Sequence, residues 1–280
     1  MKLKKTKPKS LKFNLFLIAL SLLIFLFTFL QSGEKDISTP QVPENYFIER
    51  LEIPTKLTDR PEQIITHTGF TVSYNYEWKI PNWVAYHHTK EKVDGTVPRA
   101  KHFKPDPNVP NDKTATNDDY RNTGWDKGHL APAADMKWSE KAMKESFYFS
   151  NVCPQNPNLN SGIWKDLEEQ VRDLTHQKGS IYVVCGPVVS KQPRTIGNNK
   201  VAVPDSFFKA LLQNENGKWS AIAFLFENES GKKPLSTYAI TVEELQYITN
   251  IDFFPTLPDD IENEVEKNVD FTKWNVKTNR

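Results

Sequence analysis

Residues 56–280 predict a single α+β domain of roughly 220 residues, a size within the usual range for one domain. Short runs rich in aromatic and β-branched side chains are typical of strands. One longer segment repeats apolar residues at helical spacing. Residues 56–280 contain no internal repeat and no low-complexity tract. We therefore expect one folded domain behind an N-terminal segment of different character.

Six runs are expected to form strands, because aromatic and β-branched residues fit a half-buried pleated surface. They are residues 70–78, 83–87, 147–152, 180–184, 207–212 and 220–226. Residues 100–123 are rich in Lys, Pro, Asn and Asp and are expected to form a long loop. Loops of that length inside a domain are usually functional or lack fixed structure.

Three helices are expected. After Leu159, apolar residues recur at steps of three and four and predict a helix that Gly179 ends; they are Trp164, Leu167, Val171 and Leu174. A shorter helix is expected at residues 139–145, and a third from Thr241 to about residue 250.

The first 30 residues have the pattern of a targeting segment. Residues 1–12 form a basic tail with six lysines and no acid, and residues 13–30 are uncharged and mostly apolar. As a helix, such a run is about 27 Å long, just enough to cross a bilayer. We expect the tail to stay in the cytoplasm and the domain to be exported.

Two alternatives remain for residues 13–30. The fit to a signal peptidase site around Leu30-Gln31-Ser32-Gly33 is poor, which favours an uncleaved membrane anchor over a cleaved signal peptide. The first would hold the domain at the membrane, and the second would release it. Residues 31–55 are polar, contain three prolines and are expected to link this segment to the domain.

The charge of the domain argues against a protein that simply coats nucleic acid. The whole chain has a net charge of +1, but residues 13–280 contain 30 basic and 35 acidic residues, a net charge of −5. Proteins that bind nucleic acid without a focused site are basic. Any attraction to phosphate must therefore be local, as in an enzyme with a cleft.

The two cysteines, Cys153 and Cys185, form no closely spaced pair, so a structural zinc site is not expected. In an exported protein they could form one disulfide. Both lie in or beside apolar, strand-like runs, so two buried thiols fit equally well.

Chemistry-bearing residues are concentrated at 120–135 and 150–168. His129 lies in a stretch broken by Gly and Pro and is expected on a loop or strand end. A neutral imidazole is suited to take a proton from water. Asn160 precedes the expected helix, where its amide oxygen can serve a hard cation such as Mg²⁺. Each is a weak signal alone, since loop histidines are usually structural and such asparagines are usually N-caps.

Together these segments carry a specific pattern. It consists of Asp-Lys-Gly-His at 126–129, Asn-Val-Cys-Pro-Gln at 151–155, Leu-Asn-Ser-Gly-Ile-Trp at 159–164, and Glu168. Its order and spacing resemble the DNA/RNA non-specific endonuclease family, which has a ββα-metal (His-Me finger) core and includes endonuclease G relatives. Arg99 and the stretches 183–188, 203–209 and 253–258 extend the resemblance to roughly residues 60–265.

The resemblance implies a role for each matching residue. His129 corresponds to the general base, and Asn160 to the only direct protein ligand of one Mg²⁺, for which Mn²⁺ could substitute. Glu168 corresponds to an acid that orients metal-bound water, and Asn151 to a site asparagine. Arg99 resembles the cation that clamps phosphate and stabilises developing charge.

Lys127 departs from the family pattern, which has an arginine there. Lysine keeps the charge but loses the planar two-pronged contact to phosphate. We expect activity to survive with weaker transition-state stabilisation.

The resemblance also implies a fold and a reaction. The fold is a mixed, mainly antiparallel central sheet flanked by helices, with the ββα-metal element in one cleft. The reaction is hydrolysis of phosphodiester bonds in DNA and RNA to give 5′-phosphate ends. Little base preference is expected, because phosphate contacts carry no sequence information directly.

Several alternatives stay open at this point. One is a non-catalytic surface protein that captures nucleic acid for uptake. Others are a toxin with an immunity or inhibitor partner, and a homodimer.

Overall fold

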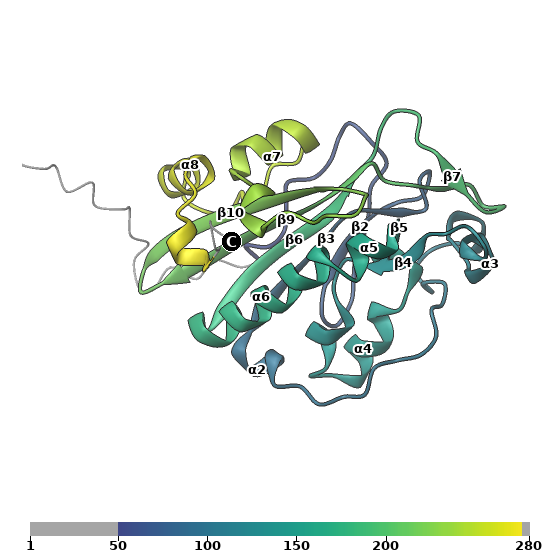
Figure 1. Ribbon diagram of the computed structural model, residues 1–280, viewed down its shortest axis with the longest axis horizontal. Coiled ribbons are helices and arrows are strands. Elements are labelled where there is room, and N and C mark those ends of the chain that lie inside the picture. The colour runs from purple at the N-terminus through teal and green to yellow at the C-terminus, as the bar shows by residue number, and fades with distance from the viewer. Residues whose placement is uncertain (1–49, 276–280) are drawn as a thin grey trace, which may run out of the picture. The chain divides into compact units, whose positions relative to one another are not determined.

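The computed structural model describes residues 50–275 and places a seven-stranded sheet at their centre (Figure 1). Every neighbouring pair in this sheet is antiparallel. In spatial order the strands are β1 (Gln63–Thr66), β2 (Thr71–Asn75), β3 (Ile80–Thr89), β6 (Ser180–Val188), β9 (Ser206–Glu215), β10 (Lys218–Glu227) and β11 (Ala239–Ile240). The expected α+β fold with a mainly antiparallel sheet is confirmed.

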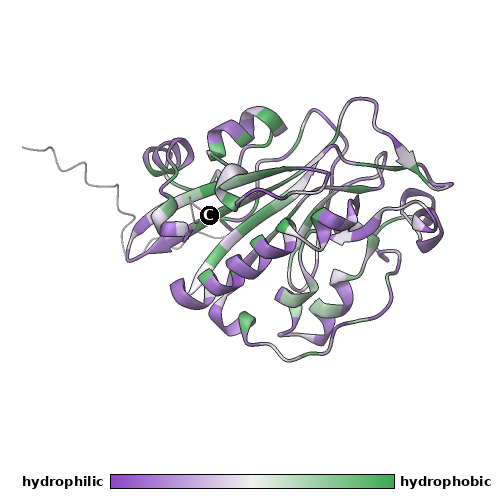
Figure 2. Ribbon diagram, viewed as in Figure 1, coloured by the Kyte–Doolittle hydropathy of each residue, from purple (hydrophilic) through white to green (hydrophobic). Residues whose placement is uncertain are grey.

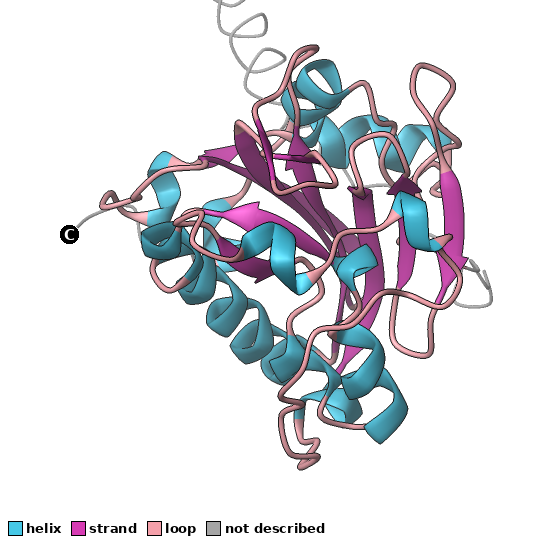
Figure 3. Ribbon diagram, turned by 90° about the vertical axis from the view of Figure 1, so that its right-hand side faces the viewer, coloured by secondary structure: helices cyan, strands magenta, loops and turns pink. Residues whose placement is uncertain are grey.

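Both faces of the sheet are covered, which explains why its central strands are almost continuously buried. Successive side chains of a strand point to opposite faces. Val183 accordingly packs in one hydrophobic core and Val184 in the other. Figure 2 shows largely hydrophobic central strands, and Figure 3 shows helices on both sides of them.

Different helices cover the two faces. The first core includes apolar residues of α6 (Ile163–Lys178), and α4 (Glu140–Ser146) lies on the same side. The second core lies under α7 (Val242–Thr249) and α8 (Asp259–Lys267). The shorter helices are α2 (Lys90–Val93), α3 (Asn117–Tyr120) and α5 (Pro157–Asn160).

The structure confirms the three expected helices. They could be predicted because each carries an apolar pattern and local signals for its ends. All four apolar residues expected on one face of α6 are buried, and Gly179 follows with φ 94°. The Ser139 side chain caps α4. Thr241 and Glu244 form a reciprocal capping box at the start of α7.

The strand expected at residues 147–152 is wrong. Phe149–Asn151 form a 3₁₀ turn, and the strand that follows is β5 (Val152–Gln155). The apolar residues here are buried, but the Asn151 amide bonds the backbone of Ala131 and Ser146 and supports a turn. Apolar content alone does not distinguish such a turn from a strand.

The expected loop at 100–123 contains two short elements, a 3₁₀ turn at Asn111–Lys113 and α3. Thr116 and Asp119 form a capping box at the start of α3. Two further two-stranded ladders lie outside the main sheet. One pairs β4 (Asp126–His129) with β5, and the other pairs β7 (Thr195–Ile196) with β8 (Val201–Ala202).

Three expectations concern the ends of the chain and the cysteines. The segment 13–30 lies outside the described residues, and no helix within 50–275 is long and apolar enough to cross a bilayer. Leu51 is buried in the second core, so the domain includes residues before the expected boundary at 56. Cys153 and Cys185 are both buried free thiols.

Candidate active site

The antiparallel pair of β4 and β5 holds His129 at the end of a short strand. Asp126 pairs with Gln155 at one end of the ladder, and His129 pairs with Val152 at the other. A Cβ atom at Gly128 would collide with the Gln155 side chain, so glycine is required at this position. The expected placement of His129 at a strand end is therefore found.

The His129 ring lies in an aromatic enclosure. Its centroid is 5.0 Å from the Phe103 ring and 4.7 Å from the Phe147 ring, and the residue is 9% exposed. Burial, reinforced by the positive charge of Arg99, lowers the pKa of His129 to about 3. The imidazole is thus neutral near pH 7, as a general base must be.

The two ring nitrogens of His129 differ in their surroundings. The Nε2 atom is buried and makes no hydrogen bond within the described residues. The other ring nitrogen, Nδ1, is not among the buried side-chain atoms without a partner.

Two cationic side chains lie over the rings that enclose His129. The Arg99 guanidinium carbon is 5.1 Å from the centre of Phe147, and Lys127 Nζ is 5.1 Å from the centre of Phe103. Lys127 Nζ also donates a 3.2 Å hydrogen bond to Asn117 Oδ1. Both expected cations therefore lie near His129, and Arg99 is the one whose charge lowers the pKa of the imidazole.

Asn160 lies at the last residue of α5, which Asn156 caps and Pro157 begins. Its Nδ2 atom donates a 2.9 Å hydrogen bond to Asp126 Oδ2. This bond fixes the plane of the amide and leaves Oδ1 available as an oxygen ligand. Asp126 had no assigned role in the sequence analysis, although its place in the Asp-Lys-Gly-His pattern was the available signal.

Glu168 is half-buried on α6 and belongs to a group of charged side chains under that helix. Burial and the negative charge of Asp135 raise its pKa to about 7, against the lowering effect of Lys209 and Arg172. Arg172 donates a 2.9 Å bond to Asp135. Lys209 is fully buried, with Nζ 4.5 Å from the centre of the Trp164 ring.

The helix carrying Glu168 is not continuous with the turn carrying Asn160. Ser161 and Gly162 separate α5 from α6, and Gly162 adopts φ −106° and ψ −121°. Asn160 and Glu168 therefore lie on two separate helices.

Asn151 is fully buried, and its amide is fully engaged. Its Oδ1 accepts a 2.9 Å bond from Ala131 N–H, and its Nδ2 donates to the carbonyls of Ala131 and Ser146. Its own backbone carbonyl accepts from Leu130 N–H. Asn151 therefore braces the segment just after His129 and does not face an open site.

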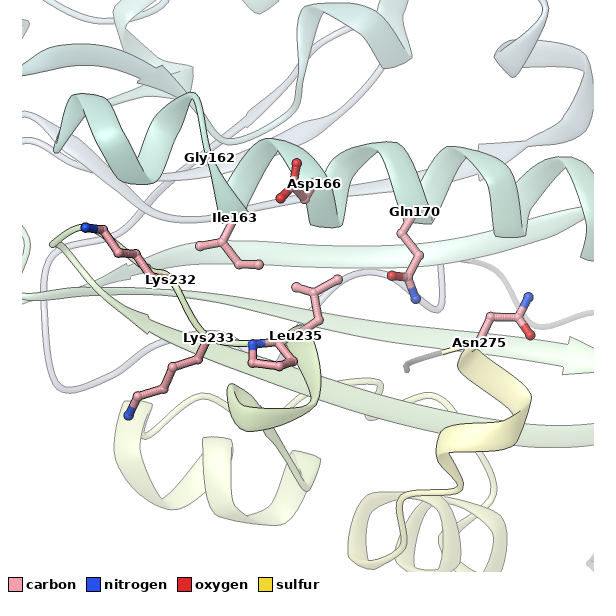
Figure 4. Close-up of a pocket in the computed structure, with 10 residues that line it drawn as sticks. Gly162, Ile163, Asp166, Gln170, Lys232, Lys233, Leu235 and Asn275 are labelled. Carbon is pink, nitrogen blue, oxygen red and sulfur yellow. The ribbon is translucent and has the colours of Figure 1, made fainter. Parts of the chain in front are cut away.

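A surface pocket of about 770 Å³ adjoins the turn after Asn160 (Figure 4). Ile163 and Leu235 face each other across it, and Lys232 and Lys233 extend from the opposite loop. The pocket reaches Gly162 but is lined by none of the six expected site residues. This pocket therefore does not contain the expected site, whose residues His129 and Lys127 lie on β4.

The oxygen donor beside β4 fits a hard divalent cation. Asn160 offers an amide oxygen, a ligand of the type that Mg²⁺ prefers, and the Asp126 carboxylate fixes the orientation of that amide by accepting the bond from its Nδ2. A neutral imidazole, two cations and an oxygen donor are the groups that metal-assisted phosphodiester hydrolysis requires.

Comparison with known proteins agrees with this chemistry. The pattern of the DNA/RNA non-specific endonuclease family matches residues 50–260, so the chain belongs to that family. Members of this family depend on a divalent metal ion.

Individual relatives show the same relationship. The mitochondrial nuclease EXOG of Homo sapiens is 37% identical over 209 residues, covering 68% of this chain and 56% of the relative. Human mitochondrial endonuclease G is 34% identical over 211 residues, which cover 70% of this chain and 70% of the relative. The chain thus spans little more than half the length of the EXOG relative.

The fold comparison gives the same assignment. A crystal structure of an EndoG/EndoGI complex, described as showing the mechanism of EndoG inhibition, has a TM-score of 0.69 to this chain. The two are 28% identical, and the match covers 75% of this chain and 91% of the other.

The relatives correct one expectation. From residues 1–30 we expected an exported or membrane-anchored domain outside the cytoplasm, but EXOG, endonuclease G and the related Nuclease 1 are all named as mitochondrial. The expected location is wrong. Several kinds of N-terminal targeting segment combine basic and apolar residues. Charge and hydropathy alone therefore do not specify the compartment.

Proposed function

We propose that this chain is a metal-dependent endonuclease that hydrolyses phosphodiester bonds in DNA and RNA with little sequence preference. The observation that supports it most is the pairing of a neutral, enclosed His129 with an Asn160 amide that Asp126 holds in one orientation. The family and the nuclease names of the relatives support the same reaction.

In this proposal His129 is the general base. Its Nδ1 accepts a proton from the water that attacks phosphorus, and its low pKa keeps it ready to do so near pH 7. The enclosing rings of Phe103 and Phe147 restrict the imidazole and help to bury it. Asn151 holds the backbone that follows.

Asn160 is proposed to hold the metal ion, which we propose to be Mg²⁺, with Mn²⁺ as a substitute. When bound, such an ion polarises the phosphoryl oxygens and stabilises charge on the leaving group. Asp126 orients the Asn160 amide, and Glu168 is proposed to orient water near the ion.

Arg99 and Lys127 are proposed to contact the phosphate that is cleaved. Preorganised positive groups stabilise the charge that develops on the phosphoryl oxygens. These two side chains lie on either side of the His129 enclosure, over its two aromatic rings. Such side chains contact the phosphate backbone and not the base edges, which accounts for the low sequence preference.

The direct test is digestion of supercoiled plasmid and of single-stranded RNA by the purified full chain. We expect both to be cut when Mg²⁺ is present and both to stay intact in excess chelator. Tight binding of DNA without any cutting in Mg²⁺ would instead support a non-catalytic capture protein. A homodimer and a protein inhibitor remain predictions that this assay does not address.

A further inference from the structure

Three carboxylates converge on the face of the sheet opposite His129. Glu262 and Glu266 lie one turn apart on α8, and Asp252 lies on the segment that joins α7 to α8. One carboxylate oxygen from each residue lies within 4.8 Å of the other two. Figure 1 shows α7 and α8 together above the sheet, on the side away from α6.

Glu266 is the buried member of this cluster, with only 8% of its surface exposed. Its Oε2 accepts a 2.9 Å hydrogen bond from Gln246 Nε2, and Gln246 is itself fixed by a bond from Phe253 N–H. The other oxygen, Oε1, is buried without a hydrogen-bond partner among the described residues. A buried acceptor without a partner lowers the stability of the folded protein unless it binds a cation or a proton.

The other two members are held in complementary ways. Glu262 also has a buried Oε1 with no partner in the described part of the chain. Asp252 is exposed and fixed from behind, since its Oδ2 accepts a 2.7 Å bond from Thr55 Oγ1 and its backbone carbonyl accepts from Thr55 N–H. The cluster therefore combines two unsatisfied buried oxygens with an anchored carboxylate open to solvent.

The charges around this cluster are repulsive. Burial, together with the neighbouring acids, raises the pKa of Glu266 to about 8 and that of Glu262 to about 7. Within residues 50–275, every charged group that shifts these two pKa values is acidic. Lys267 is the lysine of α8, and its Nζ lies 3.9 Å from Oε1 of Glu243, with which it forms an ion pair outside the cluster.

We propose that Asp252, Glu262 and Glu266 bind one Ca²⁺ ion, at a site separate from the catalytic centre. The ligands are all oxygens, and the three carboxylates supply three negative charges once an ion displaces their protons, which suits a hard divalent cation. Oxygens on opposite sides of Ca²⁺ are separated by roughly 4.6–5.2 Å, so one ion can contact all three carboxylates as placed. Mg²⁺ requires shorter bonds in near-octahedral geometry and fits this irregular set less well.

The consequence of the site is structural. A bound ion would join α8 to the segment that precedes it and would neutralise buried repulsion. Because ion binding favours the folded state, Ca²⁺ should raise the unfolding temperature of the protein.

The test measures Ca²⁺ binding by the full chain after chelator treatment, by calorimetric titration and by thermal unfolding. The background is Asn160→Ala, which removes the proposed catalytic metal ligand. We expect one Ca²⁺ per chain and an unfolding temperature that rises with Ca²⁺ more than with equal Mg²⁺. Glu266→Gln and Glu262→Gln should each weaken binding by roughly 10- to 100-fold, a range typical of disturbed metal sites.

Asp260→Asn is the matched control, because Asp260 is an exposed acid on the same helix outside the cluster. It should bind Ca²⁺ as the parent does. The glutamine variants keep the side-chain shape and remove repulsion, so they should fold, as circular dichroism can verify. Absence of stoichiometric binding at millimolar Ca²⁺, equal binding by Glu266→Gln, or an equal Mg²⁺ effect would overturn the proposal.

Discussion

The imidazole of His129 is neutral because of what surrounds it. Two aromatic rings exclude water from it, and Arg99 adds a positive charge that opposes protonation. With a pKa of about 3, the ring stays neutral from about pH 5 to 8, the range in which an unperturbed histidine changes its charge. The same residue thus combines low proton affinity with a buried Nε2 that has no hydrogen-bond partner within the described residues.

Arg99 should therefore influence the pH dependence of cleavage. The kcat/KM of the enzyme should fall as the pH drops through the pKa of its general base. Arg99→Gln removes a charge that lowers this pKa, so the acid limb of the kcat/KM profile should move to higher pH. Lys101→Gln, which changes an exposed lysine nearby, should leave the limb in place. An unmoved limb in Arg99→Gln would show that its charge does not act on the base.

Lys127 is the residue at which this chain departs from the family pattern. Lys127→Arg should keep or raise kcat/KM, because it restores a two-pronged phosphate contact. Lys127→Ala should lower kcat/KM by roughly 10²-fold, in line with loss of one preorganised charge at the transition state. Plasmid cleavage rates measure both variants. Unchanged cleavage by the alanine variant would mean that Lys127 serves Asn117 alone.

Two short elements, β4 and α5, are joined by the bond from Asn160 to Asp126. Neither element is long enough to be stable alone, so tertiary contacts must hold them. The bond connects the strand that carries His129 to the turn that carries the proposed metal ligand. The relative placement of base and metal therefore depends on Asp126.

Asp126→Ala should loosen the Asn160 amide without removing it. We expect the Mg²⁺ concentration for half-maximal cleavage to rise by roughly 10- to 100-fold, the usual effect of losing a residue that orients a metal ligand. Asp118→Ala, at an exposed acid paired with Arg121, is the control and should behave as the parent. An unchanged Mg²⁺ requirement in Asp126→Ala would show that this bond does not set the ligand.

Long, capped elements could be predicted from the sequence, and short ones could not. The face of α6 and the caps of α4 and α7 are local signals, so their positions were predicted correctly. Strands such as β1 and β4 have four residues each and exist because they are paired with a partner. A local pattern cannot report a partner that is distant in the chain.

The same limit applies to the site. The pattern at 126–129 and 151–168 predicted that these residues form one site, and the structure places His129, Lys127 and Asn160 on the neighbouring elements β4 and α5. The pattern did not reveal that both polar atoms of the Asn151 side-chain amide form hydrogen bonds with backbone atoms. It also did not reveal the role of Asp126, which requires knowledge of a contact across 34 residues.

The fold brings together the elements that carry His129 and Asn160, which we propose to have different roles. His129 lies on a strand and Asn160 on a helical turn, and their neighbours Leu130 and Leu159 are buried in the core that packs α6 against the sheet. If His129 only removes a proton and Asn160 only holds the metal, their loss should impair cleavage in different ways. This separation of roles is the central claim of the proposed mechanism.

The most direct test measures plasmid cleavage against Mg²⁺ concentration for His129→Ala and Asn160→Ala, with and without added imidazole. His129→Ala should lose roughly 10²- to 10⁴-fold in rate, the usual range for a general base, and keep the parent's Mg²⁺ dependence. Imidazole should partly restore it. Asn160→Ala should require more Mg²⁺, and imidazole should not help. Near-parental activity of His129→Ala, or the parent's rate and Mg²⁺ dependence in Asn160→Ala, would contradict the mechanism.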